Sequence, residues 1–258
     1  MAARPSRGGR FWFVTLVAVV TISSTLGLGR WQISRAAEKE AIQADIARQE
    51  KLPPLDAQAF LALQNPVGEL HREVRLRGLW LPPHTVYLDN RQMHGVPGFY
   101  VVTPFALEGS DQTVLVQRGW VQRNFNDRNQ LEPVDTPAGL VEVVGRISAP
   151  PAHLLDLGKG GPEAPAPNAE GSSRIRQNLD LEAFRKETGL PLRTDISLQQ
   201  TGAASEGLQR EWPAPALGVE RHYGYAFQWF GLSALVFILY VWFQFIAPYR
   251  RTRLARRA

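Results

Sequence analysis

A histidine stands at the start of the longest uncharged segment of the chain, and aromatic residues follow it. His222 comes just before residues 223–249, which carry no charge, and Tyr225 and Trp229 lie about one and two helical turns further on. A neutral imidazole can ligate a metal ion, and flat aromatic rings below it can wall an apolar binding site. The alternative is an ordinary membrane-interface belt, where such residues gather at the end of a spanning helix. Both interpretations stay open at this point.

Two arginines in the middle of the chain offer anion-binding chemistry. Arg91 lies in segment 89–98, whose Asp, Asn, Gly and Pro residues predict a long turn between strands. Arg118 precedes Gly119-Trp120 in an apolar run. A guanidinium group can hold a carboxylate through two parallel hydrogen bonds, so each arginine is a candidate for binding an acidic ligand or a partner protein. The competing interpretation is that both form ion pairs on the sheet.

Other catalytic and metal-binding chemistry finds little support. The chain has no cysteine, which excludes iron–sulfur clusters, cysteine-ligated zinc, catalytic thiols and disulfides. The remaining histidines lack the paired spacing of a metal site and are predicted to be surface residues: His71, His84, His94 and His153. The sequence also lacks the nucleophile-elbow, phosphate-loop, zinc-protease and dinucleotide motifs. We therefore predict that the protein is not an enzyme.

Two uncharged segments near the chain ends must position these residues. Residues 11–29 are bounded by Arg10 and Arg30, and residues 223–249 by Arg221 and Arg250. At about 1.5 Å per residue, each is long enough for the roughly 30 Å of a bilayer's hydrocarbon core. A cleaved signal peptide is the alternative for the first, but its apolar core is long and no small-residue cleavage motif follows. We predict transmembrane helices at residues 11–29 and 223–247.

Charge predicts how these helices are oriented. The tails, residues 1–10 and 248–258, hold three and five arginines and no acidic residue. Without these eight, 21 basic residues remain against 24 acidic ones, so the basic character belongs to the tails. Both tails are therefore predicted to be cytoplasmic, with residues 30–222 on the opposite, periplasmic side. The lipid bilayer is an expected partner and nucleic acid is not. The short arginine-bearing start favours a bacterial inner membrane.

Residues 30–222 are predicted to form a β-rich domain, which makes the chain an α+β membrane protein. A polar helix continues the first span to about residue 51. Short β-branched and aromatic runs then predict an antiparallel sheet or partial barrel, with strands at 72–80, 86–88, 99–103, 114–120, 140–147 and 195–199. Residues 180–188 are predicted to be a helix. Residues 150–171, with five prolines and four glycines, are predicted to be a flexible insertion.

Motifs along nearly the whole chain resemble those of the Surfeit locus protein one family. They are Leu28-Gly29-Arg30-Trp31-Gln32, residues 86–91, residues 97–105, Arg118-Gly119-Trp120-Val121 and the block from His222 to Phe230. The order of helix, domain and helix agrees as well. The resemblance implies an assembly factor for a haem–copper cytochrome c oxidase with no reaction of its own.

The resemblance also implies a cargo, a site and partners. Bacterial members are associated with binding haem a and delivering it to the oxidase core subunit, and the implied axial ligand of the haem iron is His222. We expect Tyr225, Trp229 and Trp31 to wall the macrocycle and Arg91 and Arg118 to hold its propionates. Expected partners are the core subunit and the haem a synthesis enzyme. The alternative is a cofactor-free membrane scaffold that stabilises an oxidase subunit during assembly.

Overall fold

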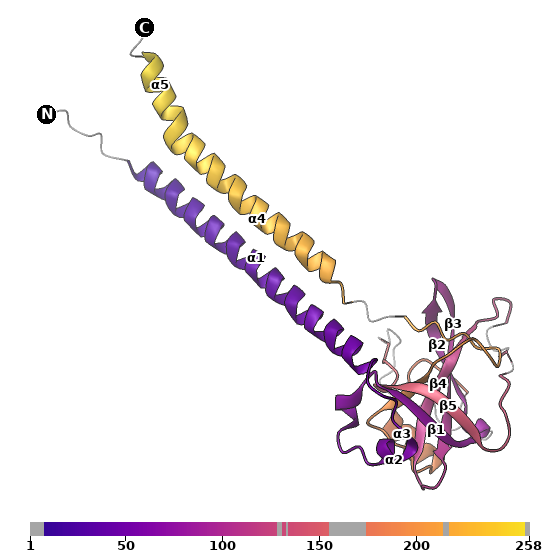
Figure 1. Ribbon diagram of the computed structural model, residues 1–258. Coiled ribbons are helices and arrows are strands. Elements are labelled where there is room, and N and C mark those ends of the chain that lie inside the picture. Colours follow the sequence, from indigo (N-terminus) through magenta and orange to yellow (C-terminus); the bar gives the residue numbers. More distant parts are fainter. Residues whose placement is uncertain (1–7, 128–130, 133, 155–173, 214–216, 256–258) are drawn as a thin grey trace. The chain divides into compact units, whose positions relative to one another are not determined.

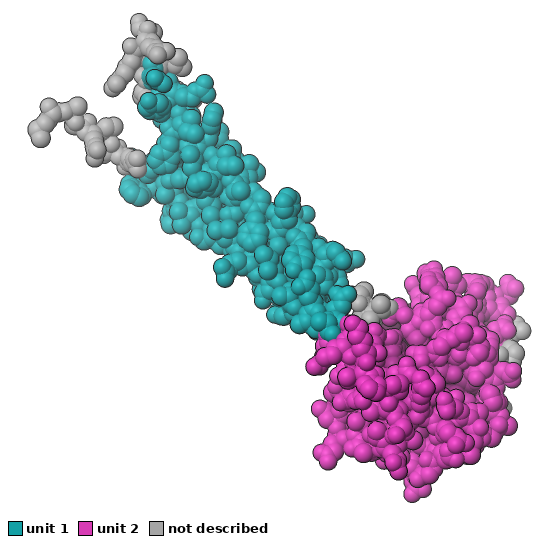
Figure 2. All heavy atoms as spheres, in the orientation of Figure 1, with its two compact units in different colours: residues 1–44, 216–258 teal, residues 45–215 magenta. Residues whose placement is uncertain are grey.

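The computed structural model describes residues 8–127, 131–132, 134–154, 174–213 and 217–255, and it divides into two compact units (Figure 2). Unit 1 comprises residues 1–44 and 216–258 and contains two long helices, called here the helix pair. Unit 2 comprises residues 45–215 and contains the sheet, called here the β domain. The β domain therefore begins inside the last turns of the first helix, because residues 30–44 belong with the helix pair.

The helix pair consists of α1 and the segment from α4 to the C-terminus. Helix α1 runs without interruption through Gly9–Gln49, which confirms that the first span continues into a polar helix. Helix α4 spans Val219–Val241, a π-helical turn follows at Trp242–Ile246, and α5 spans Ala247–Ala255. Both apolar stretches are long enough to cross a membrane, and only 11% and 6% of them is buried within the chain. So much exposed apolar surface supports a membrane protein rather than buried helices of a soluble one.

α1 and α4 lie side by side and antiparallel (Figure 1), and they meet along one stripe of each helix, called here the seam. The least exposed residues are separated alternately by four and three positions, which is the spacing of left-handed helix pairs. On α1 they are Phe11, Thr15, Ala18, Ile22, Thr25, Gly29, Gln32 and Ala36. On α4 they are His222, Ala226, Trp229, Ser233, Val236 and Tyr240. Small residues occupy many of these positions, because close backbone approach favours helix association in lipid.

The β domain is a seven-stranded mixed sheet that closes partly on itself. Its strands are β1 (Glu73–Trp80), β2 (Val86–Met93), β3 (Val96–Leu107), β4 (Thr113–Gln122), β5 (Val141–Ser148), β6 (Ile175–Arg176) and β7 (Ser197–Gln200). The strand order is β1-β5-β7-β4-β3-β2-β6, and β1 also pairs with β3. That extra pairing joins β1, β5, β7, β4 and β3 into a ring, which confirms the predicted partial barrel. The sheet is not purely antiparallel, since β4–β7 and β2–β6 are parallel.

Apolar residues fill the barrel and cover one of its outer faces. Inside, alternate residues of β1, including Val74 and Leu76, pack with Phe60 of helix α2 (Ala57–Leu61). Outside, helix α3 (Leu181–Thr188) packs Phe184 against the other face of the sheet. α3 confirms the predicted helix, because Asp180 caps its first turn and Gly189 ends it in a left-handed conformation. Two 3₁₀ turns lie at Pro66–Glu69 and Pro82–His84.

The predicted long turn at residues 89–98 is wrong. Strand β2 continues through Asp89 and Asn90, which form a bulge where the register with β3 shifts between Leu88 and Arg91. Asn90 has a φ of 59°, a conformation that asparagine tolerates better than most residues. Asp and Asn are typical of turns, but here they form a bulge within a strand. The actual turn is the two residues His94-Gly95, both with positive φ. Pro97 and Gly98 already belong to β3.

The beginning of the proline-rich segment packs on the β domain. Pro151 is buried, the Ala152 carbonyl accepts a hydrogen bond from Arg91, and Leu154 exchanges two hydrogen bonds with the Asn178 side chain. The rest of the predicted flexible insertion, residues 155–171, lies outside the described residues.

Candidate functional site

His222 lies on the seam of the helix pair and contacts a polar residue of the facing helix. Its ring is half-buried, and its Nδ1 is 2.7 Å from the Oε1 of Gln32. Because a carboxamide oxygen has no proton to give, Nδ1 must be the donor. A neutral ring then keeps its lone pair on Nε2, the nitrogen that could ligate a metal ion. Metal-binding histidines in proteins are commonly oriented by such a bond from their other nitrogen.

Sequence reasoning missed the role of Gln32, although a signal for it exists. Gln32 continues the stripe of Thr25, Gly29 and Ala36 at alternate spacings of four and three. His222 begins the matching stripe on α4. If the two stripes are packed against each other in antiparallel orientation, Gln32 and His222 come together at the same end of the helix pair.

The predicted aromatic neighbours of His222 do not share one face. Trp229 lies on the seam with His222, two turns deeper and half-buried, with Ala226 buried between them. Tyr225 lies off the seam with 52% of its surface exposed, and Trp31 is 51% exposed. The structure thus puts His222 and Trp229 on one stripe and leaves Tyr225 and Trp31 on outward-facing surface of the same unit.

Gly29 lets the Phe230 ring of α4 pack directly against the α1 backbone. A Cβ added at this residue would lie 2.7 Å from the Cε1 of Phe230, a distance that side chains do not tolerate. The Phe230 ring therefore occupies the space that a larger residue would need. Gly27 has nothing within 4 Å of such a Cβ, so of these two glycines only Gly29 is in close contact with α4.

Arg91 is buried inside the β domain and bonds to backbone. Its Nη2 donates to the carbonyls of Ala152 at 2.7 Å and Gln177 at 3.3 Å, and its guanidinium lies 5.9 Å from the centre of the Tyr100 ring. Burial lowers the pKa of this guanidinium from its usual value. In turn the Arg91 carbonyl accepts a hydrogen bond from the Trp120 indole. Arg91 thus ties β2 to two segments that are distant from it in the sequence, around Ala152 and Gln177.

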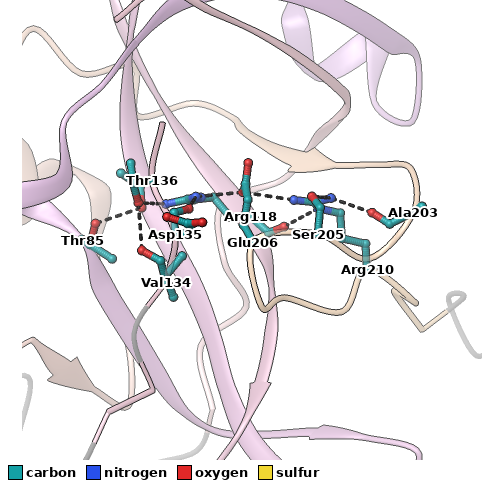
Figure 3. A network of polar contacts seen from close by, with 10 residues as sticks. Thr85, Arg118, Val134, Asp135, Thr136, Ala203, Ser205, Glu206 and Arg210 are labelled. Atoms are coloured by element: carbon teal, nitrogen blue, oxygen red, sulfur yellow. Dashed lines mark hydrogen bonds and ion pairs between the residues drawn. The ribbon is translucent and has the colours of Figure 1, made fainter. Parts of the chain in front are cut away.

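Arg118 is fully buried at the centre of a polar network (Figure 3). Its Nη2 donates to Glu206 at 2.8 Å and to the Asp135 carbonyl at 2.7 Å, and its Nη1 donates to Thr136 at 2.7 Å. Arg210 reaches the same Glu206 carboxylate at 3.2 Å from the other side. The Arg118 guanidinium also lies over the Trp80 ring, 4.6 Å from its centre. Arg118 does form an ion pair, but its guanidinium is buried rather than on the surface of the sheet, and Glu206 is only 20% exposed.

The predicted site residues therefore fall into two groups. His222, Tyr225, Trp229 and Trp31 belong to the helix pair, whereas Arg91 and Arg118 belong to the β domain, where each donates hydrogen bonds to other protein groups. Among the other histidines, His94 pairs with Glu211 at 2.5 Å, and His71 and His84 are half-buried rather than on the surface. In the part of the chain that the structure describes, no three histidine or carboxylate side chains converge as a metal site would require.

The sequence is similar to a known protein family along most of its length. The profile described as the SURF1 family matches residues 19–234. A SURF1-like protein from Drosophila melanogaster is 28% identical, covering 89% of this chain and 75% of its own length. A SURF1-like protein from Rickettsia felis is 25% identical, covering 88% and 94%. Surfeit locus protein 1 from Homo sapiens is 28% identical, covering 90% and 76%.

Proposed function

The chain belongs to the SURF1 family, and from this premise we propose that it is a membrane-bound assembly factor for a haem–copper cytochrome c oxidase, which holds haem a transiently and passes it to the oxidase core subunit. Haem a is the cargo in this proposal and not a resident cofactor. No reaction is assigned to the protein itself, in keeping with the assembly role that the family resemblance implies.

The observation that carries the proposal is the hydrogen bond between His222 and Gln32. It fixes the ring across two helices and makes Nε2 the nitrogen with an available lone pair in the neutral form. A single histidine imidazole is the axial protein ligand of the haem iron in globins and peroxidases. One ligand also suits a carrier, because a second strong ligand would slow release to the partner.

The apolar body of a porphyrin would be covered by residues of the helix pair. Trp229 lies on the same stripe as His222, while Tyr225 and Trp31 offer exposed aromatic surface nearby in the sequence. Their exposure supports access from the bilayer, since a lipophilic cargo can enter and leave through lipid. Arg91 and Arg118 are left out of the proposed site, because each is buried and hydrogen-bonded within the β domain.

The exposed faces of the two helices support contact with a membrane partner. Many apolar side chains of α1 and α4 point away from the seam, including Leu16, Leu235 and Phe237. We propose the oxidase core subunit as the recipient of haem a and the haem a synthesis enzyme as the donor. The basic tails support the inner-membrane orientation, with both termini cytoplasmic and the β domain periplasmic.

The test is the visible spectrum of the full chain purified in detergent from cells that make haem a. The wild type is expected to show a Soret band, and His222→Ala is expected to lose most of it because the iron loses its ligand. His153→Ala is the matched control, since it removes an exposed histidine of the β domain and should leave the band unchanged. Gln32→Leu removes the orienting bond and should weaken haem affinity by about 10–100-fold.

Each result separates the candidate functions. A wild type that purifies without a Soret band under these conditions contradicts the carrier role and favours the cofactor-free scaffold. A band that survives in His222→Ala keeps the carrier role and rejects His222 as the ligand. Equal loss in His222→Ala and His153→Ala would indicate a general defect rather than loss of a ligand.

A further inference from the structure

A groove runs along one flank of the helix pair, at the end near both chain termini. Its volume is about 750 Å³, within the roughly 300–1,000 Å³ of sites that bind small molecules. Val14, Val17 and Thr21 of α1 form one wall, and Leu239 and Phe243 form the other. Arg10 stands at one end. The groove is separate from the His222 end of the pair, since its lining on α1 ends at Thr21 and His222 pairs with Gln32, 11 residues further along that helix.

The groove has the polarity and the length of a lipid of one leaflet. Arg10, Val14, Val17 and Thr21 follow one another along a single stripe of α1, so a cation is followed by apolar wall. From Arg10 to Thr21 the helix rises about 16 Å, close to half of the roughly 30 Å hydrocarbon core. A partner's spanning helix would contact the pair over the whole core, about 20 residues, and would bring apolar residues against Arg10.

The π-helical turn shapes one wall of the groove. The seam of α4 passes through Val236 and Tyr240, and continued heptad spacing would bring residue 243 onto the seam. The turn at Trp242–Ile246 adds a residue, so that the half-buried residue is Gln244 while Phe243 lines the groove and is largely exposed. Such turns are rare and occur frequently at functional sites.

We propose that this groove binds one anionic phospholipid, with its phosphate at Arg10 and an acyl chain between Val17 and Phe243. The charge of the adjoining sequence favours an anionic headgroup over a zwitterionic one. Residues 1–10 and 248–258 together contain eight arginines and no acidic residue. Each basic residue near the surface of an anionic membrane contributes about 1 kcal/mol to binding, about a fivefold change in affinity.

The experiment is lipid titration of the full chain, purified in detergent and delipidated, followed by native mass spectrometry. The probes are phosphatidylglycerol and phosphatidylcholine with identical acyl chains. The wild type is expected to bind one phosphatidylglycerol in preference to phosphatidylcholine. Arg10→Gln should weaken phosphatidylglycerol binding about fivefold and phosphatidylcholine binding less, because the choline cation offsets the phosphate charge there. Val17→Trp should block both lipids, because the larger ring fills the groove.

Two matched variants control for general effects. Arg30→Gln removes a cation at the other end of the span, and Val20→Trp adds the same ring at a residue of α1 that does not line the groove. Neither should change lipid binding, and circular dichroism should show the same helix content for Val17→Trp and Val20→Trp. Equal affinity for the two lipids, or equal effects of the two tryptophans, would refute the site. A dimer that only Val17→Trp disrupts would also overturn it, since a second copy would then be the occupant.

Discussion

Arg118 carries a full charge in the interior of the β domain, and the residues around it explain how this is possible. Its Nη1 and Nη2 groups donate to Glu206, the Asp135 carbonyl and Thr136, and Arg210 shares the same carboxylate (Figure 3). A buried charge of this kind is tolerated only while its partner is present. Glu206 holds two arginines at once, so the loop that carries it is fastened to β4 by charge as well as by packing.

Replacing Glu206 should destabilise the protein strongly. We expect Glu206→Gln to lower the free energy of unfolding by about 3–5 kcal/mol, because the buried Arg118 charge loses its counter-ion. Glu73→Gln is the control, since Glu73 pairs with Arg75 on the exposed face of β1 and should cost less than about 1 kcal/mol. The measurement is thermal unfolding of the full chain in detergent, followed by tryptophan fluorescence. Similar melting temperatures for the two variants would contradict a stabilising role for the buried pair.

At the scale of elements, the helix pair depends on small residues along its seam. Ala18, Thr25, Gly29 and Ala36 are buried on α1, and Ala226 and Ser233 on α4. Lipid chains are as apolar as leucine, so association in a bilayer relies on close packing and polar contacts rather than on hydrophobic burial. The Thr15–Tyr240 hydrogen bond of 2.9 Å and the Gln32–His222 bond supply such contacts along the pair.

Enlarging Gly29 should separate the helices. Gly29→Leu places a side chain where the Phe230 ring already lies, whereas Gly27→Leu meets open space and is the matched control. The chain has no cysteine, so a cross-link between Thr15→Cys and Tyr240→Cys reports directly on helix proximity. We expect a short bismaleimide to link the pair in the wild-type background and with Gly27→Leu, and to link it several-fold less with Gly29→Leu. Equal yields in both backgrounds would show that the close approach at Gly29 does not hold the helices together.

At the scale of the whole molecule, the chain combines a helix pair with the surface of a membrane protein and a β domain with its own core. The helix pair exposes apolar side chains along most of its length, and the β domain buries its own core inside a partly closed barrel. In the sequence, the arginine-rich tails precede the first span and follow the second. Lysine and arginine in short tails bias them toward the cytoplasm, so the charge distribution predicts one orientation.

Reporter fusions test this orientation. A fluorescent reporter after Ala258 should be active, because that end is expected in the cytoplasm. Alkaline phosphatase inserted at the β3–β4 turn, after Gly109, should be active only if the β domain is periplasmic. Replacing the five C-terminal arginines with glutamine should produce a mixed population. Phosphatase activity at residue 258 and none at residue 109 in the unaltered chain would reverse the predicted topology.

Much of the architecture followed from local patterns. The two spans, the continuous helix after the first, the helix at 181–188 and most strands depend on hydrophobic period, uncharged length and capping residues, all of which act between near neighbours. The family resemblance was likewise carried by short motifs. Local patterns gave a wrong prediction for segment 89–98. Asp89-Asn90 form a bulge there because β3 pairs with β2 on both sides of them.

Only the tertiary structure decided what the functional candidates contact. Gln32 and His222 are 190 residues apart, and Arg118 and Glu206 are 88 apart. Such pairs depend on how helices and strands pack, and residue type says little about that. Arg91 and Arg118 had the chemistry of ligand-binding residues, but burial made them part of the domain's own scaffold. His222 had the chemistry of either an interface residue or a ligand, and packing against α1 set the orientation of its ring.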